Sequence, residues 1–180
     1  EIQVLNYLTS HDDGSPFDKE RKRTMETATK LLLSPGTAQI YYGDESARNL
    51  IVEGTQGDAT LRSFMNWEDI ENNPETQELL KHWQKLGQFR RDHLSVGAGS
   101  HTMLSEAPYV FTRKYSNATV SDLVVVGLDL EKGPKELSIG DTFEDGTQLK
   151  DAYSDTVAKV SGGKVNLDTP FTIVLLEKIQ

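Results

Sequence analysis

A histidine and two acidic residues follow an apolar stretch near the start of the chain. Residues 2–8 are mostly apolar, and His11, Asp12 and Asp13 come after them. A strand buried on both faces has this composition, and polar side chains at the C-terminal ends of parallel strands are where barrel enzymes place their catalytic groups. Asp12 is therefore a candidate catalytic carboxylate, and His11 a candidate donor to a substrate hydroxyl. The same three residues are also typical of a turn or helix cap, and both interpretations stay open.

The segment after this cluster predicts a helix and a second strand. Ser15 and Pro16 have the residue types of a helix N-cap and first helical position, with Asp18 in the first turn. Residues 34–36, Ser-Pro-Gly, end the helix. Residues 37–42 form another short, mostly apolar run. The order strand, helix, strand indicates a βαβ unit with parallel strands.

A long segment with little periodicity follows, and then a second helix. Residues 46–72 carry no clear helix or strand pattern, and loops of this length are uncommon unless they are functional. The sequence Asn-Pro-Glu at 73–75 predicts a helix start. Its apolar face repeats at helical spacing. That face consists of Leu79, Trp83, Leu86 and Phe89.

The pattern changes from helical to β after residue 96. Residues 109–115 alternate in the manner of a strand, residues 123–130 are rich in β-branched side chains, and residues 171–176 form a last apolar run. Glycine-containing turn signals separate them. This spacing predicts an antiparallel β-sandwich. We expect two domains, residues 1–95 and residues 96–180.

Composition excludes several classes of function. The formal net charge of −9 gives no electrostatic reason to bind nucleic acid or an anionic membrane surface. The chain has no cysteine, so disulfides, thiolate metal sites and cysteine nucleophiles are excluded. The four histidines lack metal-ligand spacing. Because the chain starts at Glu1, inside an expected strand, we expect it to be part of something longer.

Three motifs together resemble glycoside hydrolase family 13, the α-amylase family. Residues 5–12, LNYLTSHD, resemble the family's fourth sequence region, which ends the seventh barrel strand in a His-Asp pair. Residues 35–45, PGTAQIYYGDE, are similar to the eighth-strand stretch, and residues 62–67, RSFMNW, to the Arg-x-x-Met-x-Trp segment that follows. Ser10 departs from the asparagine of many members. The resemblance implies the last two βα units of a (β/α)8 TIM barrel followed by an all-β C-terminal domain.

The resemblance also implies roles for individual residues. Asp12 matches the carboxylate that stabilises the oxocarbenium-like transition state, and His11 matches a histidine that binds the same sugar. Five further residues become candidate substrate contacts, with strand-end packing or loop anchoring as equally open interpretations. These are Asp13, Tyr42, Asp44, Arg62 and Trp67. Trp83 is expected in the core.

The same resemblance implies that essential groups come from elsewhere. A retaining glycosidase needs a nucleophile and a general acid, which in this family follow the fourth and fifth strands. We therefore expect part of an α-glucan hydrolase that is inactive alone. The alternative is a non-catalytic carbohydrate-binding or structural cap module.

Expected partners are an α-glucan or maltooligosaccharide and either the rest of the barrel or another copy of the chain, with no nucleic acid or membrane. No cofactor or metal site is assigned to this chain. The resemblance allows calcium in the parent enzyme, with its usual ligands in earlier segments. A periplasmic, cell-surface or secreted location is expected from the family.

Overall fold

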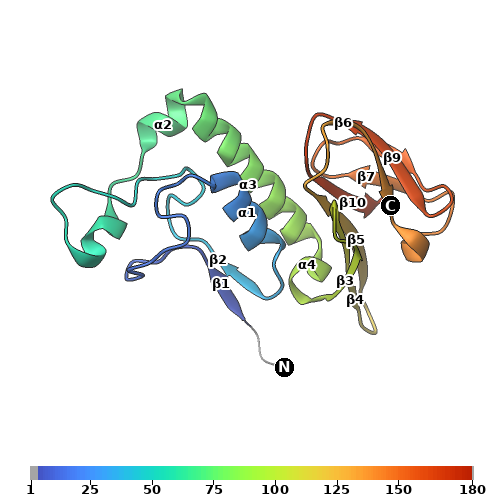
Figure 1. Cartoon of the computed structure of the whole chain (residues 1–180). Helices are drawn as coiled ribbons and strands as arrows, with labels where there is room; N and C mark the ends of the chain where they lie inside the picture. Colours follow the sequence, from blue (N-terminus) through green and yellow to red (C-terminus); the bar gives the residue numbers. More distant parts are fainter. Residues whose placement is uncertain (1–3, 180) are drawn as a thin grey trace. The chain divides into compact units, whose positions relative to one another are not determined.

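The computed structural model describes residues 4–179 of the chain. It divides into two compact units, Glu1–Gln88 and Phe89–Gln180 (Figure 1). The first combines helices with two short parallel strands, and the second is built of antiparallel sheets. The sequence placed a domain boundary after residue 95, and that assignment stays a prediction.

The first unit contains the expected βαβ arrangement. Strand β1 (Leu5–Tyr7) leads to helix α1 (Thr24–Leu33) and then to strand β2 (Thr37–Gln39). The two strands pair in parallel, with Leu5 opposite Thr37. The Asn6 side-chain amide donates to the Pro35 carbonyl at 2.7 Å. The polar residues that follow β1 and β2 therefore leave the same edge of the small sheet.

The prediction that the first strand is buried on both faces is wrong for this chain. Val4, Leu5 and Tyr7 are 56%, 53% and 49% exposed, and Ile40 beyond β2 is 51% exposed. The physical reason is that β1 and β2 form a two-stranded sheet. Strands with this composition need neighbouring strands and helices on both faces to bury them, and the described residues supply only part of that cover.

The predicted helix start at Ser15 and Pro16 is also wrong, because α1 begins eight residues after Pro16, at Thr24. Asp18 and Arg21 have positive φ angles of 55° and 54°, which interrupt a right-handed helix. The Asp18 carboxylate instead accepts hydrogen bonds from the backbone N–H groups of Lys22 and Arg23, at 2.9 and 2.8 Å. Asp18 therefore organises the turn that precedes the helix.

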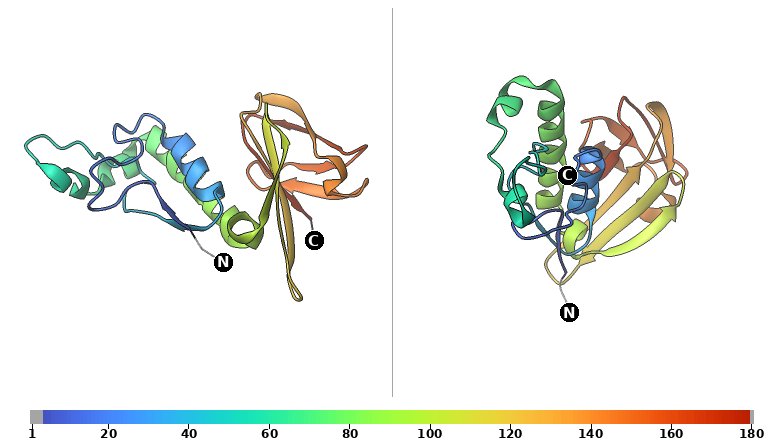
Figure 2. Two further views of the ribbon diagram at one scale, coloured as in Figure 1. Left: turned by 60° about the horizontal axis from the view of Figure 1, so that its bottom comes forward. Right: turned by 60° about the vertical axis from the view of Figure 1, so that its left-hand side comes forward.

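The long segment after β2 holds two short helices and then a long one. Element η1 spans Gly57–Arg62, α2 spans Trp67–Asn72, and α3 spans Pro74–Asp92. The Asn73 side chain accepts the N–H of Glu75 at 2.9 Å, which confirms the predicted helix start. The predicted apolar face of α3 is buried, including Trp83 at 5% exposure. His82 Nε2 lies 2.9 Å from the Thr29 hydroxyl of α1, and the ribbon shows α3 running beside α1 (Figure 2).

The second unit begins with the end of α3 and the short helix α4 (Leu94–Ala98), followed by eight strands. The strands are β3 (Ser100–Ser105), β4 (Tyr109–Ser116), β5 (Ser121–Leu128), β6 (Gly133–Ser138), β7 (Gln148–Asp151), β8 (Val157–Lys159), β9 (Lys164–Thr169) and β10 (Val174–Lys178). A 3-10 turn, η2, spans Gly140–Thr142. The six-stranded sheet has the order β3-β4-β5-β10-β7-β8, and β6 pairs with β9. All of these pairings are antiparallel, as predicted.

One apolar core draws on both sheets of this unit. Its members include Val125, Leu137, Leu149 and Leu176, from β5, β6, β7 and β10. Lys135 lies at its margin, 9% exposed, and its ammonium group donates to the Thr169 carbonyl and hydroxyl and to the Phe171 carbonyl at 2.7–3.0 Å. Three neutral acceptors thus satisfy the buried cation.

Candidate functional site

The His11 and Asp12 side chains are open to solvent beyond the end of β1. They are 66% and 63% exposed, and His11 Nε2 lies 3.7 Å from Asp12 Oδ2. The Ser10 hydroxyl donates to Asp12 Oδ1 at 2.9 Å, which orients the carboxylate within its own loop. Asp13 accepts the Ser15 N–H at 3.0 Å and so stabilises the following turn. In both Asp12 and Asp13, one carboxylate oxygen accepts a hydrogen bond from within the loop, and the exposed Asp12 side chain remains accessible to a ligand.

Arg62 ties this loop to the segment that follows β2. Its Nε donates to the His11 backbone carbonyl at 3.1 Å, across 51 residues of sequence. The structure thus brings together three of the predicted site residues, namely His11, Asp12 and Arg62. In the described structure, Arg62 acts on the backbone of the loop, and its prediction as a substrate contact stays untested.

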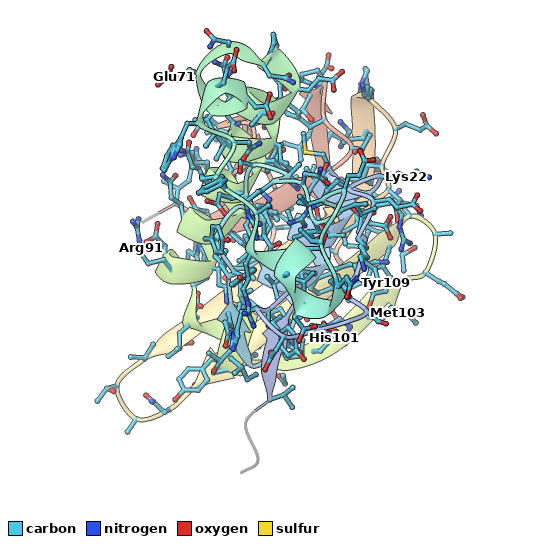
Figure 3. The ribbon with its side chains drawn as sticks, turned by 90° about the vertical axis from the view of Figure 1, so that its left-hand side faces the viewer. Lys22, Glu71, Arg91, His101, Met103 and Tyr109 are labelled. Atoms are coloured by element: carbon cyan, nitrogen blue, oxygen red, sulfur yellow. The ribbon has the colours of Figure 1, made fainter. Side chains whose placement is uncertain are left out.

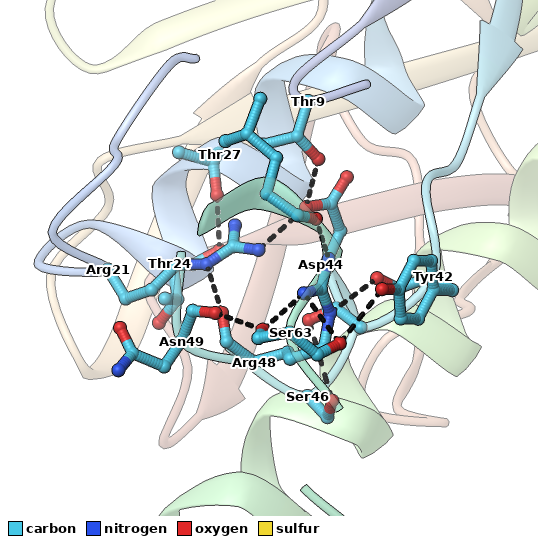
Figure 4. A network of polar contacts seen from close by, with 12 residues as sticks. Thr9, Arg21, Thr24, Thr27, Tyr42, Asp44, Ser46, Arg48, Asn49 and Ser63 are labelled. Atoms are coloured by element: carbon cyan, nitrogen blue, oxygen red, sulfur yellow. Dashed lines mark hydrogen bonds and ion pairs between the residues drawn. The ribbon is translucent and has the colours of Figure 1, made fainter. Parts of the chain in front are cut away.

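Asp44 lies in a buried network just beyond β2 (Figure 4). It is 2% exposed, and its Oδ1 accepts the Thr9 hydroxyl at 2.6 Å and Arg21 Nη2 at 2.9 Å. Arg21 also donates from Nε to the Arg48 carbonyl at 3.0 Å. Asp44 therefore joins the loop after β1 to the turn before α1, and it is held inside the unit. Its prediction as a sugar contact stays untested.

Arg48 is fully buried and anchors the loop that carries Arg62. Its Nε donates to the Tyr42 carbonyl at 3.0 Å, its Nη1 to the Ser63 carbonyl at 3.2 Å, and its Nη2 to the Leu61 carbonyl at 3.1 Å. The guanidinium also lies 3.9 Å from the centroid of the Tyr42 ring. Burial lowers the pKa of Arg48, with the neighbouring tyrosines acting in the opposite sense.

Tyr42 and Trp67, the remaining predicted contacts, differ in their surroundings. The Tyr42 hydroxyl donates to the Ser63 carbonyl at 2.8 Å, so it also holds the loop after β2, although its side chain is 41% exposed. Trp67 begins α2 and is 66% exposed. Of the two, only Trp67 presents most of its ring to solvent.

Four residues that position the site were not predicted from the sequence, namely Thr9, Arg21, Arg48 and Ser63. Polar residues in loops carry no periodicity, so nothing in their spacing marked them. One signal was present in the glycine at position 43, which has a φ of +81° and whose Cβ, if present, would lie 2.5 Å from Arg48 Cβ. Only glycine fits there, because the Arg48 side chain passes directly over it.

A cavity of about 460 Å3 lies elsewhere in the first unit. Polar and apolar atoms both line it, and they come from the turn before α1, α1 itself, the turn at Ser46, Asn66 with α2, and the start of α3. Neither His11 nor Asp12 contributes to it, so it is distinct from their loop.

Among residues 4–179, no group of three or more histidine or acidic side chains is arranged to hold a metal ion. Within the same range, no helix combines the length and apolar character needed to span a membrane.

The aromatic side chains on β3 and β4 bear on the alternative of a carbohydrate-binding module. Phe111 is only 4% exposed. The Tyr109 hydroxyl lies 3.0 Å from His101 Nε2, and both residues are labelled in Figure 3. The His101 and Phe111 ring centroids are 4.7 Å apart. These rings pack on one another, and Phe111 is not available to stack on a ligand.

In sequence, the chain is similar to an α-amylase. No family model matches the chain. It is 39% identical over 120 residues to the periplasmic α-amylase of Escherichia coli (strain K12). The aligned residues make up 66% of this chain and 17% of that protein. The chain therefore spans less than a fifth of the curated relative.

Solved structures share the fold at low sequence identity. An Anoxybacillus α-amylase matches 99% of the chain with a TM-score of 0.66 and 19% identity, over 39% of its own length. The α-amylase of Geobacillus thermoleovorans, solved with acarbose, matches 97% of the chain with a TM-score of 0.64 and 19% identity, also over 39% of its length. In sequence and in fold, the chain is thus related to the α-amylases, and it fits the C-terminal part of an α-amylase-type enzyme of glycoside hydrolase family 13.

Proposed function

We propose that this chain supplies part of the active site of a retaining α-glucan hydrolase. Asp12 is the carboxylate that stabilises the oxocarbenium-like transition state, and His11 binds a hydroxyl of the same sugar. The observation that carries this assignment is the position of both side chains. They are more than 60% exposed at the C-terminal end of a parallel strand, the edge at which barrel enzymes bind substrate.

Residues 1–95 contribute the last two βα units of a TIM barrel in this proposal. The apolar side chains exposed around β1 and β2 support it, because a barrel would bury them under further strands. The fit of the chain to about two fifths of the solved α-amylases is consistent with the same idea. Without the remaining strands, these surfaces favour self-association of the isolated chain.

The isolated chain is inactive in this proposal because it lacks the nucleophile and the general acid. A retaining mechanism needs two carboxyl groups about 5–5.5 Å apart on either side of the scissile bond. Asp12 and Asp13 are adjacent in one loop, and Asp13 is bonded to the Ser15 N–H. This arrangement argues against a pair that flanks a glycosidic bond.

The substrate of the complete enzyme would be an α-glucan or maltooligosaccharide. Two of the similar solved structures, both of AmyP, contain maltose and maltotriose. A periplasmic or secreted location follows by analogy with the Escherichia coli relative. Calcium, if the parent enzyme binds it, would use ligands from other segments.

The test is reducing-sugar release from soluble starch, by the chain alone and by the full-length gene product. We expect no release by the chain. In the full-length protein, Asp12→Asn should lower kcat by at least about 100-fold, a typical cost for losing one preorganised electrostatic contact. Asp141→Asn, an exposed acid in the second unit, is the matched control. Starch hydrolysis by the chain that Asp12→Asn abolishes would contradict the proposal. Sugar binding without hydrolysis in the full-length protein would favour the binding-module alternative.

A further inference from the structure

Phe64 is the most exposed large apolar side chain in the described structure, at 99%. It lies between Ser63 and Met65, three residues before Trp67, which is 66% exposed. A single exposed apolar residue is ordinary on a protein surface. Two exposed aromatic side chains this close in sequence are less usual, and exposed apolar groups that cluster indicate a binding surface.

The backbone that carries Phe64 is held on both sides. Before it, the Ser63 carbonyl accepts hydrogen bonds from Arg48 Nη1 and from the Tyr42 hydroxyl, at 3.2 and 2.8 Å. After it, the Asn66 side chain accepts the Ser46 hydroxyl at 2.7 Å and donates to the Ser46 carbonyl at 2.9 Å. Phe64 is therefore an exposed ring on a restrained loop. A ring carried by a restrained backbone loses less conformational freedom on binding a ligand than a ring on a mobile loop.

This loop also adjoins the loop of His11 and Asp12. Arg62, two residues before Phe64, donates to the His11 carbonyl at 3.1 Å. In Figure 1 the segment between β2 and α2 lies beyond the ends at which β1 and β2 finish. The exposed residues Leu5 and Tyr7 differ in this respect, because they belong to strand β1 of the sheet itself and would be covered by neighbouring strands. Phe64 instead follows the edge of the sheet where the candidate catalytic side chains lie.

We propose that Phe64 is a sugar-binding residue that stacks on a glucosyl ring of an α-glucan bound across the His11–Asp12 loop, with Trp67 as a neighbouring aromatic contact. This inference rests on the proposed function and adds a binding subsite to it. The C–H face of a pyranose ring is apolar, and a flat aromatic ring can cover it without competing for the sugar hydroxyls. The contact needs no charge, which suits a neutral ligand and an acidic chain.

The experiment measures binding of maltoheptaose to this chain by saturation-transfer-difference NMR. We expect millimolar binding to the wild-type chain, with transfer to sugar ring protons. Phe64→Ala should raise Kd at least threefold, whereas Phe64→Tyr, which keeps the ring, should restore it. The control is Ile51→Ala, which removes an apolar side chain of 51% exposure from the same segment. Because Phe64 packs against little, its variants should keep the amide spectrum of the wild-type chain.

Saturation transfer that depends on the Phe64 ring supports the proposal. Absence of transfer from the wild-type chain, or an equal Kd for wild type and Phe64→Ala, overturns it. The starch assay separates this result from the proposed function. If Phe64→Ala binds normally while Asp12→Asn abolishes hydrolysis by the full-length protein, the subsite is wrong and the function stands. If ring-dependent binding is found while Asp12→Asn hydrolyses starch normally, the function is wrong and a glucan-binding surface remains.

Discussion

Replacing Arg48 with methionine should loosen the loop that links the two candidate site segments. Arg48 is fully buried, and it donates to three backbone carbonyls, those of Tyr42, Leu61 and Ser63. Methionine fills a similar volume but has no donor. The Ser63 carbonyl would keep the Tyr42 hydroxyl as a partner, whereas the carbonyls of Tyr42 and Leu61 would both lose the guanidinium.

The expected loss follows from these two carbonyls. An unsatisfied buried carbonyl costs about 1–3 kcal/mol, which applies to Leu61. The bond to the Tyr42 carbonyl is only part-buried, so its loss adds less. Removal of the contact with the Tyr42 ring adds about 1 kcal/mol. Removal of a buried charge that has no hydrogen-bonded carboxylate partner offsets part of this cost. We therefore expect Arg48→Met to destabilise the first unit by about 3 kcal/mol.

Native-state amide hydrogen exchange is the assay, because it reports local opening of residues 42–66 separately from the second unit. Exchange at Val52 and Ala59, whose N–H groups donate to the Thr60 hydroxyl and the Gln56 carbonyl, should accelerate by about two orders of magnitude, the equivalent of about 3 kcal/mol. Arg23→Met is the control, since the Arg23 side chain is 53% exposed. Protection at Val52 and Ala59 that matches the wild-type chain would refute the idea that Arg48 anchors this loop.

Two further predictions concern the same unit. Gly43→Ala should destabilise it by at least about 2 kcal/mol, because position 43 has a φ of +81° and a Cβ would lie 2.5 Å from Arg48 Cβ. Urea denaturation measures this, and a Gly54→Ala variant, also at positive φ but with open space around it, should cost less. Burial lowers the pKa of His82. The charge of Lys85 lowers it further, and a hydrogen bond to the Met25 carbonyl raises it in part. The unfolded chain therefore binds the proton more readily, so stability is full above about pH 6.5 and falls as the pH drops below that value. His82→Gln should reduce the decrease of the urea midpoint between pH 7.5 and pH 5, whereas the control His11→Gln should leave it unchanged. If the urea midpoint of His82→Gln decreases with pH as much as that of the wild-type chain, the assignment to His82 is wrong.

Regular elements with a strong apolar pattern could be predicted from the sequence. The buried face of α3 and its start at Asn73 follow from helical spacing and capping. Strands β4, β5 and β10 were expected within three residues of their observed bounds. Strand β3 was not, because none of its residues is buried, and the pair β6–β9 was not, because each of these strands has only two or three buried positions. The start of α1 was misplaced because the carboxylate of Asp18 stabilises a turn there.

The candidate site could be predicted only as a set of residues. Spacing and residue type singled out His11 and Asp12, and both are exposed at a strand end. The sequence could not distinguish a side chain that faces solvent from one held inside the unit. Asp44 and Tyr42 belong to hydrogen-bond networks whose other members, such as Thr9 and Arg48, are far apart in the chain or lie in a loop without periodicity. Such networks depend on tertiary geometry, which no local pattern records.

Helix α3 has a consequence for how the two units unfold. It runs without interruption from Pro74 to Asp92, while the compact units divide between Gln88 and Phe89. Only the last four residues of this helix therefore belong to the second unit. A segment that short cannot remain helical by itself in water. Unfolding of the first unit would remove the helical turn that precedes those four residues, and the start of the second unit would lose its helical structure. The two stabilities are in this sense linked by a shared helix, and a chain cut at residue 88 would lack that linkage.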